Sequence, residues 1–290
     1  MQESSILTLA KNTLRLEAES LLEMRDTIGK DFEEVVNLLN GMSGRLVVTG
    51  IGKSAIIGQK IVATFNSTGT PAIFMHAADA LHGDLGMIQQ GDPVLIISKS
   101  GESPEIKALI SLIKNFGNTM IAMVGNMESS LAKSADLILN TTVSQEACPN
   151  NLAPTASTTA QLAMGDALAV CLMEIKGFGS QDFAKFHPGG TLGKKLYLRV
   201  SELCEKNERP KVLENSSLKE VIIEITKKRL GLTVVVDEEE HWVGVITDGD
   251  LRRMLEKGID LQSSKAHEIM TKSPKTIEPD ALAVDALDKM

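Results

Sequence analysis

The chain has 290 residues, 43% of them hydrophobic, and carries a formal net charge of −8 at pH 7. This length accommodates a full α/β core and a smaller second unit. No apolar run approaches the roughly 20 residues that a membrane-spanning helix needs, so we expect no membrane partner. An acidic chain with only 3% aromatic residues also argues against nucleic-acid binding, because neither a basic surface nor stacking aromatics are available.

The first residues and the cysteines indicate the compartment. The segment Met1–Ser5 lacks the basic start and apolar core of a signal peptide. Cys148, Cys171 and Cys204 are odd in number and widely spaced, as expected for reduced thiols. We therefore expect a cytoplasmic protein.

From the start of the chain, apolar residues have helical spacing over 3–40, with breaks at Gly29 and at 41–44. After Arg45, short apolar runs alternate with amphipathic segments. The predicted strands are 46–49, 72–75, 94–98, 120–124 and 137–139, and the predicted helices are 54–66, 106–116 and 157–176. This alternation predicts an α/β fold with a doubly wound parallel sheet, Rossmann-like or flavodoxin-like, in which ligands bind beyond the carboxyl ends of the strands.

Beyond about residue 198 the pattern changes to an internal repeat. Residues 210–214 and 274–278 align, and each copy begins as a short strand followed by a helix. The second copy stops at Met290 before its equivalent strands, which indicates a fragment. We expect a first domain over 1–198, a first repeat over 199–262 and the start of a second over 263–290, the repeats forming a smaller α+β unit.

The turn 98–105 carries the clearest chemical signal. A buried strand ends in it, and the next helix opens with Pro104. Backbone N–H groups, the positive end of the helix dipole and several hydroxyls then meet at one point, which suits a phosphate. The candidate phosphate-binding residues are Ser98, Ser100, Gly101 and Ser103. Glu105, in the first helical turn, either complements the helix dipole or acts as a base.

A glycine turn at 50–55 matches G-x-G-x-x-A and makes a dinucleotide-binding fold a rival interpretation. That fold needs an acidic residue at the end of the second strand, which here ends in Met75 and His76. The turn therefore offers backbone amides and the ammonium group of Lys53 to a ligand, or is a plain turn with a solvated lysine.

Three further segments carry polar candidates. His76 and His82 follow the second strand with acids nearby, so that proton transfer and a metal site are both open. The hydroxyl run 155–159 either caps the long helix or supplies a second wall for a phosphate. His187 precedes Pro-Gly-Gly in an extended segment and is free to reach a site, including one in a neighbouring subunit.

Taken together, these motifs resemble the sugar isomerase (SIS) family, and more narrowly the arabinose 5-phosphate isomerases that carry C-terminal CBS motifs. The resemblance rests on segments 50–54, 67–71, 82–86, 100–103, 146–149, 152–155, 165–169 and 187–190, and on 247–253 for the CBS motif. It implies reversible conversion of D-ribulose 5-phosphate to D-arabinose 5-phosphate through an enediol, feeding 3-deoxy-D-manno-octulosonate (Kdo) for lipopolysaccharide. It also implies a homotetramer and no required cofactor.

The resemblance assigns roles to individual residues. It associates catalysis with Lys53, Glu105, Glu146 and His187. With the phosphate-binding turn, the expected substrate contacts are Gly69, Thr70, His82, Ser98, Ser100, Gly101, Glu102, Ser103, Thr155 and Ser157. His76 is linked to a zinc ion that tends to inhibit. Glu105 is our first choice of base, Lys53 would stabilise the enediolate, and His82 or His187 would move protons between the oxygens.

The sequence leaves several alternatives open. Lys99 stands where the family often has Asn and adds positive charge near the phosphate. Thr247 and Asp250 suit the ribose and phosphate of a nucleotide or sugar nucleotide, but a packing role explains them equally well. A non-catalytic sugar-phosphate sensor is the second functional class, because SIS modules attached to a DNA-binding helix-turn-helix serve that way. The sequence does not distinguish isomerases that serve lipopolysaccharide, capsule or sugar-alcohol metabolism.

Overall fold

The computed structural model describes residues 6–205, 207–258 and 260–290. Residues 3–5 of the first predicted helix lie outside the described residues. The chain divides into two compact units, Met1–His187 and Pro188–Met290, so the first unit ends before the predicted boundary at 198.

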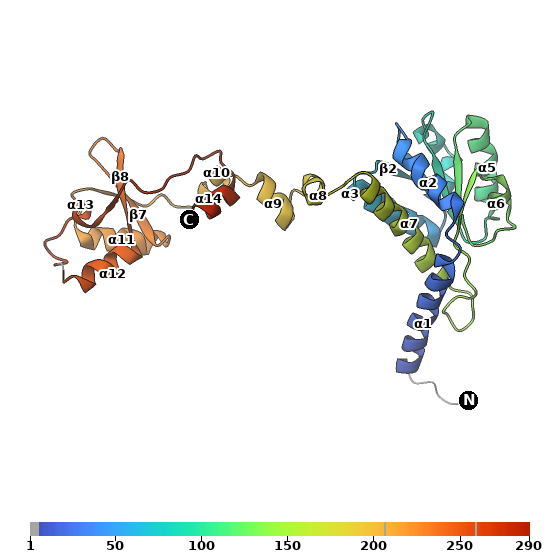
Figure 1. The fold of residues 1–290 in the computed structure, drawn as a ribbon, viewed down its shortest axis with the longest axis horizontal. Coiled ribbons are helices and arrows are strands. Elements are labelled where there is room, and N and C mark those ends of the chain that lie inside the picture. The colour runs from blue at the N-terminus through green and yellow to red at the C-terminus, as the bar shows by residue number, and fades with distance from the viewer. Residues whose placement is uncertain (1–5, 206, 259) are drawn as a thin grey trace. The chain divides into compact units, whose positions relative to one another are not determined.

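The first unit is built on a five-stranded sheet in which all neighbouring strands are parallel (Figure 1). Its strands are β1 (Leu46–Gly50), β2 (Ala72–His76), β3 (Val94–Ser98), β4 (Met120–Val124) and β5 (Leu137–Asn140). Their order is β2-β1-β3-β4-β5, the flavodoxin-like arrangement. This confirms the predicted doubly wound sheet, and the order reverses between β1 and β3.

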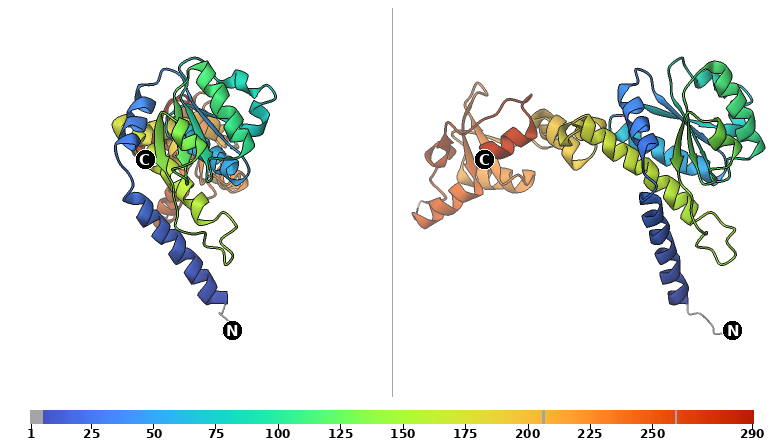
Figure 2. Two further views of the ribbon diagram at one scale, coloured as in Figure 1. Left: turned by 90° about the vertical axis from the view of Figure 1, so that its right-hand side faces the viewer. Right: turned by 45° about the vertical axis from the view of Figure 1, so that its right-hand side comes forward.

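Helices cover both faces of this sheet, as the two views in Figure 2 show. The helices of this unit are α1 (Ile6–Arg25), α2 (Lys30–Gly41), α3 (Lys53–Ser67), α4 (Ala77–Ala80), α5 (Pro104–Phe116), α6 (Ser130–Ser134), α7 (Ala156–Ile175) and α8 (Ser180–Phe186), with a 3₁₀ helix η1 (Asp84–Met87), and α8 lies away from the sheet. Successive strand residues face opposite sides. Val48 therefore packs in one apolar core with α1, α2, α3 and α7, whereas Val47 packs in a second core with α4, α5 and α6.

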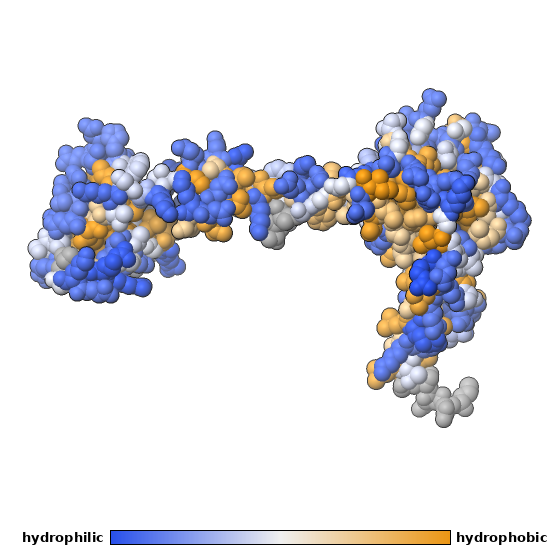
Figure 3. All heavy atoms as spheres, viewed as in Figure 1, coloured by the Kyte–Doolittle hydropathy of each residue, from blue (hydrophilic) through white to orange (hydrophobic). Residues whose placement is uncertain are grey.

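The N-terminal helix α1 packs on the unit only through its C-terminal part. Its buried residues are Ser20 and Met24. Leu7 and Leu14 lie one heptad apart on the projecting part and are 71% and 68% exposed. Figure 3 shows the corresponding apolar patches along this helix.

The second unit contains a mixed four-stranded sheet in the order β6-β7-β8-β9. Its elements are α9 (Thr191–Tyr197), α10 (Val200–Cys204), β6 (Lys211–Leu213), α11 (Leu218–Lys228), β7 (Leu232–Val236), β8 (Trp242–Thr247), α12 (Asp248–Glu256), α13 (Ala266–Ile269), β9 (Thr271–Lys272) and α14 (Ala283–Lys289). Strand β9, from the start of the second repeat, pairs with β8 of the first. The incomplete repeat thus extends the sheet of the complete one.

Candidate functional site

A cleft of about 320 Å³ lies at the carboxyl ends of β1 and β3, where the strand order reverses. The chain leaves β1 toward α3 on one face and leaves β3 toward α5 on the other, so the two connections diverge and open a crevice. The residues that line it are Ile51, Lys53, Ser54, Ser98, Lys99, Ser100, Ser103, Pro154, Ser157, Thr158 and Gln161. The structure thus brings together Lys53, three of the predicted phosphate-binding residues and the start of α7.

The hydroxyls of the turn after β3 differ in whether they form hydrogen bonds within the turn. Ser98 Oγ accepts the N–H of Gly101 at 3.0 Å, and Ser100 Oγ accepts the N–H of Glu102 at 3.3 Å. These bonds close the turn. Ser103 occupies the N-cap position of α5, but its hydroxyl is buried and has no hydrogen-bond partner among the described residues. Because a buried polar group normally has a partner, the Ser103 hydroxyl is the group in this turn most open to a ligand.

Gly101 and Glu102 fasten the turn to α6 instead of facing the cleft. Gly101 has φ of +66°, and a Cβ atom there would lie 2.3 Å from Ser129 Oγ, so only glycine fits. The Glu102 carboxylate is bound by Lys107 at 2.6 Å and by the N–H and hydroxyl of Ser130. These contacts lower the pKa of Glu102 to about 2. Gly101 and Glu102 thus hold the turn in place, and their contact with substrate stays a prediction.

Glu146 is completely buried behind the cleft, with both carboxylate oxygens occupied. Oε1 accepts from Lys99 Nζ at 2.6 Å and from the Ser157 hydroxyl. Oε2 accepts from the N–H of Thr155 at 2.8 Å and the N–H of Ser157 at 3.1 Å. Burial raises the pKa of Glu146, but these donors outweigh burial and hold it at about 2. The carboxylate is therefore ionised at neutral pH and anchors the N-terminus of α7.

The two hydroxyl residues at the start of α7 have separate positions. Ser157 lines the cleft, as predicted for a second wall. Thr155 is not among the lining residues, because its hydroxyl donates to Glu146 and accepts the N–H of Ala147 at 2.9 Å. Thr155 thus positions Glu146.

Glu105 and His187 are not among the cleft-lining residues in one copy of the chain. Glu105 is half-buried in the first turn of α5, one residue beyond Pro104. The ring of His187 stacks on Phe183 with 3.8 Å between centroids, and its Nδ1 lies 2.8 Å from the Phe183 carbonyl oxygen. Glu105, the predicted base, therefore lies at the start of α5, directly after the turn that follows β3, whereas the ring of His187 lies against Phe183.

Gly69 and Thr70 lie at the opposite edge of the sheet from the cleft. They precede β2, whose first residue Ala72 pairs with Leu46 at the amino end of β1. Thr70 is buried, and its hydroxyl accepts from Lys176 Nζ at 2.8 Å. Within one copy, Gly69 and Thr70 are therefore separated from Lys53 by the five-residue length of β1, and their contact with substrate stays a prediction.

His76, the last residue of β2, and His82, which follows α4, do not form a complete metal site among the described residues. His76 Nδ1 lies 3.7 Å from Asp79 Oδ2, and His82 is exposed. Within the described parts of the chain, no group of three or more His, Cys, Asp or Glu side chains is arranged to hold a metal ion. Two donors alone do not fit a zinc ion, which takes four ligands.

Sequence reasoning did not name two polar residues of the cleft, Ser54 and Gln161, as candidates for ligand binding. Ser54 donates to Gln161 Oε1 at 3.2 Å and so joins α3 to α7 across the cleft. Ser157, Thr158 and Gln161 share one face at the start of α7, and this polar spacing in an otherwise apolar helix was the available signal.

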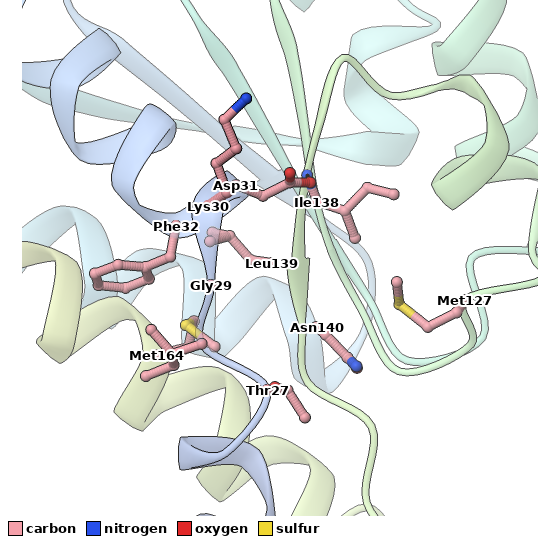
Figure 4. Close-up of a pocket in the computed structure, with 11 residues that line it drawn as sticks. Thr27, Gly29, Lys30, Asp31, Phe32, Met127, Ile138, Leu139, Asn140 and Met164 are labelled. Carbon is pink, nitrogen blue, oxygen red and sulfur yellow. Dashed lines mark hydrogen bonds between the residues drawn. The ribbon is translucent and has the colours of Figure 1, made fainter.

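A second cavity of about 230 Å³ lies between the α1–α2 turn, β5 and α7 (Figure 4). The Asp31 carboxylate accepts the N–H of Ile138 at 2.9 Å, and the ammonium group of Lys30 points away from the other side chains drawn. None of the predicted site residues lines this cavity. Its charged groups are therefore not directed at a common ligand.

Comparison with known proteins gives consistent results for both units. An SIS domain family model matches residues 42–171, and a CBS domain model matches residues 200–257. Arabinose 5-phosphate isomerase KdsD of Pseudomonas aeruginosa is 47% identical over 290 residues, which cover 100% of this chain and 89% of the relative. KdsD of Yersinia pestis is 49% identical over 281 residues, which cover 97% of this chain and 86% of the relative.

A solved structure, that of an E. coli CFT073 protein in complex with arabinose 5-phosphate, has 40% sequence identity and a TM-score of 0.62 to this chain, and the match covers 65% of this chain and 100% of that one. Identity of this extent, over the cleft-bearing unit and the repeat-bearing unit together, shows that the chain belongs to the arabinose 5-phosphate isomerase family.

Proposed function

We propose that the chain interconverts D-ribulose 5-phosphate and D-arabinose 5-phosphate in the cleft between the ends of β1 and β3. The observation that carries this proposal is the cleft itself, which combines two lysines with an unpartnered buried hydroxyl at the start of α5. An acidic protein needs such local donors to hold a sugar phosphate, because its overall charge repels the substrate. The relatives named for this reaction support the same substrate.

The reaction proceeds through an enediolate. A base removes a proton from C1 of open-chain ribulose 5-phosphate, and the C1–H electron pair forms the C1–C2 double bond while the C2 oxygen gains negative charge. Transfer of the O1 proton to O2 through a relay group, and return of the abstracted proton to C2, then leave the C1 aldehyde and the C2 hydroxyl of arabinose 5-phosphate. Lys53, in the cleft, would stabilise the oxygen that gains charge.

Glu105 is the base in this proposal. It follows the phosphate-binding turn directly, and the residue is half-buried. Glu146 is a poorer base, because its two oxygens are already occupied by donors and its pKa is held at about 2. His82 and His187 are the candidate relay groups.

A second copy of the chain completes the site in this proposal. His187, Gly69 and Thr70 do not join the cleft of their own copy, and α1 exposes apolar residues that a neighbouring copy would cover. A homotetramer, as the resemblance implies, would bring these three residues to the cleft of another copy and would cover the apolar residues of α1.

An inhibitory zinc ion at His76 would likewise need ligands beyond His76 and Asp79. Zinc titration of His76→Ala against the unmodified protein tests that site.

The cellular part of the proposal is a supply of arabinose 5-phosphate for Kdo and lipopolysaccharide in the cytoplasm. Among the described residues, no helix has both the length and the apolar character to cross a membrane.

In the second unit, Thr247 and Asp250 form a capping box at the start of α12, with Thr247 Oγ1 donating to Asp250 at 2.7 Å. A nucleotide or sugar nucleotide at these residues would have to displace that cap.

Incubation of the protein with D-ribulose 5-phosphate, followed by NMR, tests the proposed function. The aldose signals of arabinose 5-phosphate should grow until equilibrium is reached, and the reverse reaction from arabinose 5-phosphate should reach the same ratio. Binding of the sugar phosphate without formation of any aldose would instead favour a non-catalytic sensor.

A further inference from the structure

Lys99 combines a fixed position with a partly exposed ammonium group. Its carbonyl oxygen accepts the N–H of Gly125, which holds the backbone at the end of β3. Its Nζ lies 2.6 Å from Glu146 Oε1, and the side chain is 46% exposed, whereas Glu146 is 0% exposed. The ammonium group therefore reaches from a buried anchor to the wall of the cleft, where Lys99 is a lining residue.

The ion pair leaves part of Lys99 available. An ammonium group has three N–H donors. One of them is directed at Glu146, and no other protein acceptor for Lys99 Nζ is present in the described part of the chain. Lys99 lines the cleft together with Ser100 and Ser103, and Ser103 is the N-cap residue of α5. Three features that favour an anion thus meet here, namely a cation, a free hydroxyl and a helix N-terminus.

The second cation of the cleft, Lys53, begins α3 after the other strand of the crevice. A five-carbon sugar phosphate carries its phosphate at one end and its reacting carbons at the other. Two lysines on separate elements match these two ends. Lys99 belongs to the same turn as the candidate phosphate-binding hydroxyls. We therefore expect Lys99 to contact the phosphate end of the sugar phosphate and Lys53 to contact the reacting carbons.

We propose that Lys99 binds the phosphate group of the sugar, and that Glu146 is a positioning residue that holds the Lys99 ammonium at the cleft. This inference rests on the proposed function, because it takes the same cleft as the sugar-phosphate site. It identifies Lys99 as a specificity-determining residue, because its ammonium group favours a sugar that carries a phosphate.

Binding of D-arabinitol 5-phosphate tests the inference without turnover, because this polyol has no carbonyl and cannot isomerise. Calorimetry would compare the unmodified protein with Lys99→Met, and we expect roughly 10- to 100-fold weaker binding in the variant, the usual effect of losing a charge-assisted hydrogen bond. Lys99→Arg keeps the charge and should bind within about threefold of the unmodified protein. Steady-state kinetics should show the Lys99→Met effect mainly in KM.

Lys60→Met is the matched control. Lys60 is also a half-exposed lysine in an ion pair, with Nζ 2.5 Å from Asp166 Oδ1, but it is not among the cleft-lining residues. The Lys60→Met variant should bind D-arabinitol 5-phosphate with the same affinity as the unmodified protein. Thermal unfolding of each variant checks the fold, and Lys99→Gln replaces Lys99→Met if the latter does not fold.

The outcomes separate the inference from the proposed function. Equal binding by Lys99→Met and the unmodified protein, with a lower unfolding temperature, would mean that Lys99 only neutralises Glu146, and would overturn the inference while the isomerase proposal stands. A protein that binds D-arabinitol 5-phosphate but forms no aldose from ribulose 5-phosphate would contradict the isomerase proposal and leave the phosphate role of Lys99 supported.

Discussion

Two glutamates near the cleft have opposite surroundings. Glu146 is buried, ionised and bound by five hydrogen-bond donors, whereas Glu105 is half-buried at the first turn of α5. Residues of one chemical type thus take different roles because their environments differ.

Replacement of Glu105 by Gln should therefore abolish turnover with only a modest loss of sugar-phosphate binding. The amide has nearly the same shape but cannot accept the C1 proton, and general-base catalysis typically contributes about 10²- to 10⁴-fold. NMR of the aldose formed, together with calorimetry of D-arabinitol 5-phosphate, measures both quantities. Turnover close to that of the unmodified protein would remove Glu105 from this role.

Replacement of Glu146 by Gln should lower stability in a pH-dependent way. The pKa of Glu146 falls from its ordinary value of 4.5 to about 2 on folding. The ionised group therefore stabilises the fold at pH above about 4.5, by up to about 3 kcal/mol, and this contribution is lost as the pH falls toward 2. Urea unfolding should show a large difference between the variant and the unmodified protein at pH 7 and a smaller one at pH 3.5. A difference that does not change with pH would contradict this assignment.

At the scale of elements, the cleft depends on how closely α3 and α7 pack. Ser54 and Gln161 join these helices through a hydrogen bond, and Gly165 allows their close approach. A Cβ atom at Gly165 would lie 2.4 Å from Ile61 Cγ1, and Ile61 is fully buried. The helix pair is therefore held at a separation that only glycine permits.

Gly165→Val should lower the free energy of unfolding by about 3 kcal/mol, because added methyl groups in a packed core force neighbours to move. Gly86→Val is the control, since a Cβ atom at Gly86 would meet nothing within 4 Å. Urea unfolding of the two variants measures the difference. Equal midpoints for both would show that α3 and α7 can separate at little cost.

At the scale of the whole molecule, three of the residues proposed for the site lie outside the cleft of their own chain. Gly69 and Thr70 lie at the far edge of the sheet, and His187 is stacked on Phe183 outside the cleft. Leu7 and Leu14 of α1 are exposed as well. Assembly of several copies is the arrangement that would bring these groups to one site.

Light scattering after size-exclusion chromatography should therefore give four times the mass of the chain. A Leu7→Glu, Leu14→Glu variant places two charges on the exposed apolar face of α1 and should yield smaller species with reduced turnover. Lys11→Glu changes the charge of the same helix at an exposed polar position and should leave the mass unchanged. A monomer of full activity would contradict the proposed assembly.

Much of this architecture was predictable from local pattern. Strands such as 94–98 are short apolar runs bounded by turns, and α5 repeats its buried residues at helical spacing, so the parallel sheet follows from sequence. The turn between β3 and α5 was also predictable, because hydroxyls, a glycine and a first-turn proline are adjacent in the chain, whereas its binding of a phosphate stays a prediction. The family relationship follows from motifs of the same local kind.

Tertiary structure alone decided which side chains meet. Glu146 and Lys99 are far apart in the sequence, and their pairing depends on where the segment before α7 returns to the end of β3. In the same way, Glu102 turned toward Ser130, and Gly69 with Thr70 fell at the far edge of the sheet. The sequence by itself determined the elements and the chemistry available, because these depend on neighbouring residues. The positions of the charges depended on the packing of distant segments, which no local pattern records.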